Sequence, residues 1–203
     1  MKIAVIGASG RAGREITKEL SARGHQVTAI ARNADKIAAA PGVTPLSVDA
    51  AKAPALTEAL KGHDVVVSAV MFATSNPLVL IHSVKGSGVP RYVVVGGAGS
   101  LEVAPGVRLF ETPHLPKEAL PESIAGGLFL EQLRHEKDLD WTFISPAALF
   151  FEGPRQGSYR VGGDQLLKDA DGKSTISFAD FAIALVDEIE VPKHHRARFS
   201  VAY

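Results

Sequence analysis

The chain has 203 residues, of which 46% are hydrophobic, and its 22 basic residues balance 22 acidic ones. A chain of this size forms a single domain that buries roughly 70% of its unfolded surface, and balanced charge excludes general attraction to nucleic acid or to an anionic membrane. It contains no cysteine, which excludes disulfides and thiolate metal sites. No stretch reaches the ~20 apolar residues of a membrane-spanning helix. We therefore expect one domain over residues 1–203, a cytoplasmic location and no metal site.

Short β-branched runs alternate with helical patterns over the first 144 residues. We expect strands at 3–6, 26–31, 43–48, 64–70, 91–95 and 141–144, and helices at 14–23, 33–39, 53–60, 77–85 and 118–137. Continuous apolar strands that alternate with helices are typical of a parallel sheet covered on both faces. The pattern therefore predicts an α/β fold with a doubly wound parallel sheet, the Rossmann arrangement.

The pattern changes after residue 144, where glycine and proline become frequent. A helix is expected from the capping residue Ser177 to about Ile189, followed by a last strand at 198–202. By analogy with similar folds, we expect residues 150–203 to contribute a small lobe on the substrate side of the sheet.

Three glycines with regular spacing, Gly7, Gly10 and Gly13, follow the first strand and open the first helix. Glycine permits the tight turn, the close approach of backbone N–H groups to a phosphate and the close packing of helix on strand. The segment therefore predicts a pyrophosphate site, the alternative being a glycine-rich turn without a ligand. The predicted contacts are Gly7, Ala8, Ser9, Gly10, Arg11, Ala12 and Gly13.

The end of the second strand bears on the choice between NAD and NADP. An NAD site has a carboxylate there for the ribose 2′-hydroxyl, whereas this chain has Arg32, followed by Asn33. A guanidinium pairs with a 2′-phosphate, so Arg32 favours NADP. In the alternative interpretation Arg32 is a surface residue and Asp35 is the acid.

The ends of the third, fourth and fifth strands supply further candidate contacts to the dinucleotide. An acid at the end of strand three meets the adenine amino group, although an exposed turn explains Asp49 as well. Small residues at the ends of strands four and five let the dinucleotide pass close to the backbone. These candidates are Asp49, Ala50, Ser68, Ala69, Val70, Gly96, Gly97 and Ala98.

Segments along nearly the whole chain resemble the atypical short-chain dehydrogenase/reductases. They are Gly7-Ala8-Ser9-Gly10-Arg11-Ala12-Gly13, Ala31-Arg32-Asn33, Gly96-Gly97-Ala98-Gly99-Ser100-Leu101, residues 140–147, residues 153–160 and residues 176–182. The closest resemblance is to the NAD(P)H-flavin reductase group of the NmrA-like and biliverdin-IXβ-reductase-like branch. It implies a Rossmann fold that binds NAD(P), with Pro146 and Ala147 beside the nicotinamide and residues 153–159 in the substrate cleft. Arg155, Tyr159 and the loop residue His114 are therefore candidate substrate contacts. The alternatives are a core position for Tyr159 and a surface position for His114.

The chain departs from ordinary short-chain dehydrogenases because it lacks their Tyr-x-x-x-Lys pair. None of Tyr92, Tyr159 and Tyr203 has a lysine four residues later. Without that acid, hydride transfer to a flat conjugated acceptor such as a flavin or quinone is favoured, since solvent can supply the proton. Ser100 is the nearest candidate to polarise an acceptor, the alternative being a serine that caps its loop.

Two other functions stay open, and the missing pair also fits the first of them. One is an NmrA-like redox sensor that binds NADP without turnover, and the other is a biosynthetic enzyme that reuses the fold. Each of these functions implies a small-molecule ligand, and the expected assembly is a monomer or a homodimer.

Overall fold

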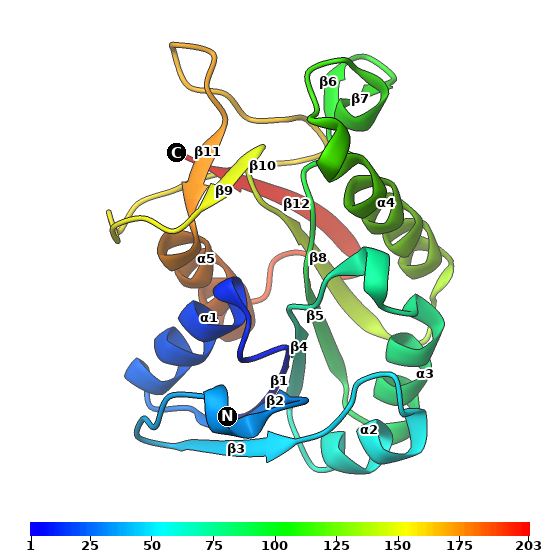
Figure 1. The fold of residues 1–203 in the computed structure, drawn as a ribbon, viewed down its shortest axis with the longest axis vertical. Helices are drawn as coiled ribbons and strands as arrows, with labels where there is room; N and C mark the ends of the chain where they lie inside the picture. Colours follow the sequence, from blue (N-terminus) through cyan, green and yellow to red (C-terminus); the bar gives the residue numbers. More distant parts are fainter.

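The computed structural model describes residues 1–203 and contains a central eight-stranded sheet with helices on both faces (Figure 1). The strand order is β10-β12-β8-β5-β4-β1-β2-β3, and every neighbouring pair is parallel except β10 with β12. The direction of winding reverses at β1, because β2 and β3 lie on one side of it and β4 lies on the other. This is the doubly wound Rossmann arrangement, which confirms the predicted fold class.

The strands of the central sheet are β1 (Lys2–Ile6), β2 (Gln26–Ala31), β3 (Val43–Ser47), β4 (Val65–Ser68), β5 (Arg91–Val95), β8 (Asp140–Ser145), β10 (Arg160–Gly162) and β12 (Ala197–Ala202). The α-helices are α1 (Arg11–Ala22), α2 (Ala53–Leu60), α3 (Pro77–Ser87), α4 (Leu120–His135) and α5 (Phe178–Glu190). The 3-10 turns are η1 (Ala34–Lys36), η2 (Phe72–Thr74), η3 (Leu109–Glu111) and η4 (Lys117–Ala119). Two small sheets pair β6 (Glu102–Ala104) with β7 (Val107–Arg108) and β9 (Leu149–Phe151) with β11 (Thr175–Ser177). None of the helices is long and apolar enough to cross a membrane.

Two hydrophobic cores lie on opposite faces of the sheet, because successive side chains of a strand point to opposite sides. In β1, Ile3 and Val5 join the core under α1 and α5, whereas Ala4 and Ile6 join the core under α2, α3 and α4. All four side chains are at most 1% exposed. The strand is therefore buried on both faces, as its continuous apolar sequence predicts.

The C-terminal quarter is more closely integrated than the predicted lobe at 150–203. Strand β12 pairs in parallel with β8 inside the central sheet, and α5 packs beside α1. Its apolar positions, such as Phe181 and Leu185, are fully buried and need the main core as a partner. Within this quarter, the β9–β11 pair and the loops around it lie outside the central layers (Figure 1), and a substrate-side role for them remains a prediction.

The turn from β1 to α1 is compact because two of its glycines face backbone atoms. Gly7 has a φ of +83°, and a Cβ there would overlap the carbonyl of Ala69 at the end of β4. A Cβ at Gly13 would overlap the carbonyl group of Gly7. Each added methyl group would therefore push α1 and the turn away from the ends of β1 and β4.

We predict that Gly13→Ala destabilises the protein, although alanine is the better helix former. The overlap with the Gly7 carbonyl should lower the free energy of unfolding by about 2 kcal/mol and Tm by roughly 4–8 °C. Thermal and denaturant unfolding measure both quantities. Gly86→Ala in α3 is the matched control, because its Cβ would meet only the side chain of Thr57, at 3.3 Å, and should be nearly neutral. A Gly13→Ala variant as stable as the parent would contradict the packing described here.

Candidate functional site

The N-terminus of α1 presents unpaired backbone donors. Gly10 is the N-cap, no side chain caps the helix, and its first turn has no acidic residue. The N–H groups of Arg11, Ala12 and Gly13 have no acceptor within the chain, whereas Gly10 N–H donates to the Gly7 carbonyl at 3.0 Å. Together with the positive end of the helix dipole, these donors favour an anion such as a phosphate.

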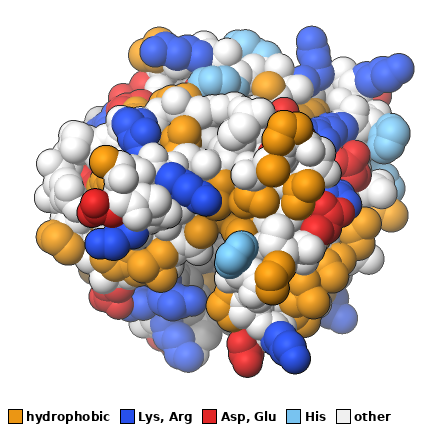
Figure 2. Space-filling view, turned by 90° about the horizontal axis from the view of Figure 1, so that it is seen from above, with side chains coloured by type: hydrophobic (Ala, Val, Ile, Leu, Met, Phe, Trp, Pro, Cys, Tyr) orange, Lys and Arg blue, Asp and Glu red, His pale blue; other side chains and the backbone are white.

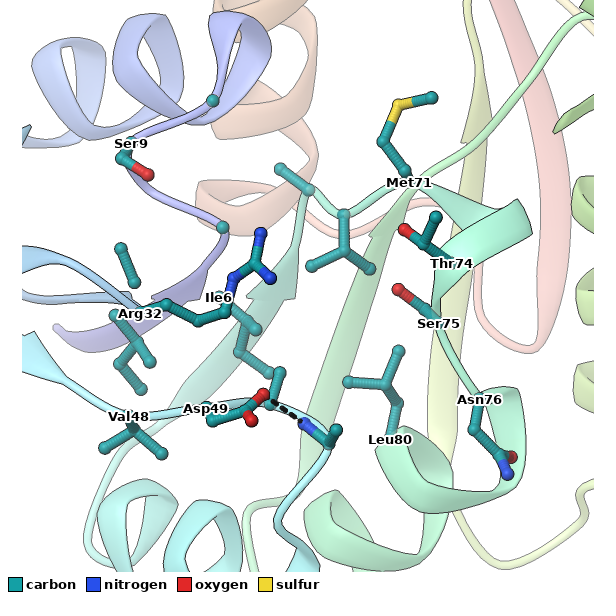
Figure 3. A pocket seen from close by; sticks show the side chains of 18 residues that line it. Ile6, Ser9, Arg32, Val48, Asp49, Met71, Thr74, Ser75, Asn76 and Leu80 are labelled. Atoms are coloured by element: carbon teal, nitrogen blue, oxygen red, sulfur yellow. Dashed lines mark hydrogen bonds between the residues drawn. The ribbon is translucent and has the colours of Figure 1, made fainter.

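A cleft of about 480 Å³ opens beside this turn, where the winding of the sheet reverses. One wall comes from the ends of β1, β2 and β3, and the other comes from the end of β4, the segment after it and α3 (Figure 3). The lining residues are Ile6, Gly7, Ser9, Gly10, Ile30, Ala31, Arg32, Val48, Asp49, Ala50, Ala51, Ala69, Val70, Met71, Thr74, Ser75, Asn76 and Leu80. Ligands of doubly wound folds bind at this position, outside the carboxyl ends of the strands.

Arg32 lines the cleft, and its guanidinium is directed into the space between the walls (Figure 3). Its carbonyl accepts a hydrogen bond from Ser47 Oγ at 3.0 Å, which holds the backbone at this point. The guanidinium makes no hydrogen bond or ion pair within the chain and is therefore free to bind an anion. Asp35, the alternative acid, belongs to η1 and does not line the cleft.

Asp49 also reaches the cleft, from the end of β3 (Figure 3). Its Oδ1 accepts the Ala51 N–H at 3.0 Å, which closes a turn and leaves Oδ2 without a partner. The exposed turn and the cleft position, which the sequence presents as alternatives, are therefore both present in the structure.

Eight predicted cofactor contacts line this cleft, and the remaining ones occupy other positions. The eight are Gly7, Ser9, Gly10, Arg32, Asp49, Ala50, Ala69 and Val70. Arg11 lies instead over the ring of Phe178, 5.4 Å from its centroid, and Asn33 caps η1 by accepting the Asp35 N–H. The side chains of Ala8 and Ala12 pack in or against the core, and Gly13 packs against the backbone of Gly7 and Ala8. At Ala12 and Gly13, only the backbone N–H groups remain available to a ligand.

Ser68 does not line this cleft, and its contact with a cofactor stays a prediction. Its side chain is 1% exposed, and its Oγ lies 2.8 Å from the Tyr92 hydroxyl in the core. Ser68 is the last residue of β4, and the first residue after it that lines the cleft is Ala69.

The segment after β5 packs closely against the rest of the protein. A Cβ at Gly96 would overlap the ring of Phe143, whereas one at Gly97 would meet only Phe72, at 3.9 Å. Gly97 and Ala98 are half-buried, and Pro146 and Ala147 are buried. The need for glycine at position 96 is therefore a packing requirement, and contact of this segment with the nicotinamide stays a prediction.

Two predicted substrate contacts lie on the α1–α5 side, away from the cleft. Arg155 forms an ion pair with Glu19 of α1, and the Tyr159 hydroxyl donates to Asp187 Oδ2 of α5 at 2.6 Å. Burial and the neighbouring Asp187 carboxylate raise the pKa of Tyr159. Both side chains thus have acidic partners within the chain, and their contact with a substrate stays a prediction.

His114 and Ser100 occupy two different environments. His114 is exposed in the loop between η3 and η4, which agrees with the alternative of a surface position. Ser100 is 8% exposed, and its Oγ accepts from Nη1 of the buried Arg198 at 3.3 Å. A catalytic role for Ser100 stays a prediction, because the partner of its hydroxyl in the structure is the Arg198 side chain.

The cleft wall formed by Met71, Thr74, Ser75 and Asn76 is absent from the sequence-based predictions. These residues follow the expected strand at 64–70 and belong to a short 3-10 turn and its flanks. Their only sequence signal is a run of small polar residues before the helix-opening Pro77. No tyrosine lines the cleft, because Tyr92 and Tyr159 bond as described and the Tyr203 hydroxyl contacts Ser177 and Asp180.

Comparisons with known proteins agree with this geometry. The chain is 45% identical over 211 residues to the uncharacterized protein YwnB of Bacillus subtilis, covering 99% of this chain and 98% of that protein. A Bacteroides thetaiotaomicron structure provisionally described as an epimerase is 41% identical, with a TM-score of 0.94 and coverage of 100% of this chain and 96% of that chain. A Streptococcus pneumoniae structure provisionally described as an NADH-flavin reductase is 38% identical, with a TM-score of 0.84 and coverage of 100% and 99%.

A model of the NAD(P)H-binding family matches residues 7–192, which contain the glycine turn, Arg32 and both walls of the cleft. The chain therefore belongs to the NAD(P)H-binding family and has the Rossmann fold of the atypical short-chain dehydrogenase/reductases.

Proposed function

We propose that this protein is an NADPH-dependent reductase that passes hydride to a flat conjugated acceptor, such as a flavin or a quinone. The observation that carries the proposal is the cleft at the reversal of the sheet, with free backbone donors on one side and Arg32 without an acidic partner. The relative from Streptococcus pneumoniae that is provisionally described as an NADH-flavin reductase supports the same reaction class.

The residues of the cleft fit a dinucleotide phosphate. The N–H groups of Arg11 and Ala12 would hold the pyrophosphate, and Gly7 would keep the turn close enough for it to approach. Arg32 would pair with the 2′-phosphate, and Asp49 Oδ2 would accept from the adenine amino group.

The bound nicotinamide would supply the hydride, and the protein would hold it against the acceptor. The phenols are engaged elsewhere, which fits an acceptor that takes its proton from solvent. The same observation argues against an epimerase function for this chain, since sugar epimerases of the short-chain family use the tyrosine.

We predict that the protein oxidises NADPH in the presence of a suitable acceptor. Mixing the protein with NADPH and FMN, riboflavin or a quinone should deplete the nicotinamide absorbance faster than the protein-free mixture. Tight NADPH binding without oxidation across the whole acceptor panel would contradict the reductase and favour a redox sensor.

We also predict that Arg32 determines the preference for NADPH over NADH. Arg32→Ala should weaken NADPH binding by about ten- to a hundredfold and leave NADH binding nearly unchanged, because only NADPH carries the 2′-phosphate. Fluorescence titration of the reduced nicotinamide measures both dissociation constants.

Lys18→Ala is the matched control for the loss of one positive charge. Its ammonium is on the exposed side of α1 and pairs loosely with Glu15 at 3.8 Å, so both affinities should be retained. Equal affinity for NADH and NADPH in the parent, unchanged in Arg32→Ala, would contradict the preference for NADP.

A further inference from the structure

The cleft wall opposite Arg32 is built by a segment with little regular structure. Met71, Thr74, Ser75 and Asn76 line the cleft from this side (Figure 3), and the segment contains only the three-residue turn η2. Seen from above, hydrophobic side chains lie beside a hollow in the surface, and Lys and Arg side chains lie on both sides of the view (Figure 2). The shape of the cleft therefore depends on what holds η2.

A carboxylate from α4 binds the start of η2. Glu122 Oε1 accepts from Phe72 N–H at 2.7 Å, and its Oε2 accepts from Ala73 N–H at 2.8 Å. Glu122 stands in the first turn of α4, half-buried, 50 positions after Phe72. Its partners are two consecutive backbone donors, so this side chain fixes the direction of the main chain.

The ring of Phe72 makes a second attachment to the same helix. Its centroid lies 5.3 Å from that of Phe129 in α4 and 5.9 Å from that of Phe143 in β8. A Cβ at Gly126 of α4 would lie 2.9 Å from the ring, so α4 leaves room for it only by having a glycine there. The ring thus anchors one residue in the core, and the carboxylate orients the backbone that continues to Thr74 and Ser75.

We propose that Glu122 is a positioning residue of the dinucleotide cleft, which it serves by holding η2 as the wall opposite Arg32. This inference rests on the proposed binding of NADPH in that cleft. Without the carboxylate, the Phe72 ring keeps η2 attached, but the two N–H groups turn to water and the wall populates other conformations. Apparent affinity falls with the fraction of molecules whose wall is in place, so a fall to about one tenth raises the Kd about tenfold.

The test compares Glu122→Ala and Glu122→Gln with the parent protein. NADPH affinity is measured by fluorescence titration, and hydrogen exchange over residues 71–76 is measured without cofactor. Glu122→Ala should raise the Kd for NADPH about tenfold and speed exchange at Phe72 and Ala73. Glu122→Gln, which keeps one acceptor oxygen, should be intermediate in both measurements.

The matched control is Glu131→Ala on the same helix, because Glu131 is exposed and pairs with Arg134 at 2.7 Å rather than with η2. It should change neither quantity. A folded Glu122→Ala with unchanged Kd or unchanged exchange at 71–76 overturns the inference, and Glu122→Gln decides if the alanine variant does not fold. If the parent itself does not bind NADPH, the proposed function fails first and the role of Glu122 in cofactor binding fails with it.

Discussion

The packing of the β1–α1 turn against the end of β4 is the constraint on which the site depends. Gly7 and Gly13 face carbonyl groups so closely that neither position has room for a side chain. This contact brings the start of α1 to the point where the winding of the sheet reverses. The free N–H groups of the helix and the opening between the strand ends thus lie at the same place, and that coincidence makes an anion-binding cleft.

The two walls of the cleft are held in different ways. Arg32 directly follows the last residue of β2, so the pairing of the sheet positions its wall of the cleft. The Ser47 hydroxyl also donates to the Arg32 carbonyl. The opposite wall leaves β4 as an irregular segment and depends on contacts from α4, which is distant in sequence. On the far side of the sheet, ion pairs of Glu19 and Asp187 tie α1, α5 and the loop around Arg155 together. They stabilise the face that supports the turn and do not enter the cleft.

The sequence predicts the parts of this structure that depend on local patterns. The apolar run of β1 and the glycines at 7, 10 and 13 identify the strand, the turn and the helix, because strand burial and close packing each restrict residue type. The position of Arg32 follows from the end of β2 in the same way.

Local sequence patterns do not predict side-chain contacts between residues that lie far apart in the chain. Arg155 and Tyr159 lie 136 and 28 positions from the acids they bind, and no local pattern reveals such pairs. Ser68 Oγ lies 2.8 Å from the Tyr92 hydroxyl, 24 positions along the chain, and no local pattern reveals this contact either. The wall from Met71 to Asn76 has no strong periodicity, and its placement by Glu122 is a long-range contact.

A crystal structure of the protein grown with NADP tests the central claim most directly. We predict that the pyrophosphate lies within hydrogen-bonding distance of the Arg11 and Ala12 N–H groups and that the 2′-phosphate lies against the Arg32 guanidinium. A dinucleotide bound elsewhere, or one whose adenosine ribose lies away from Arg32, would contradict it.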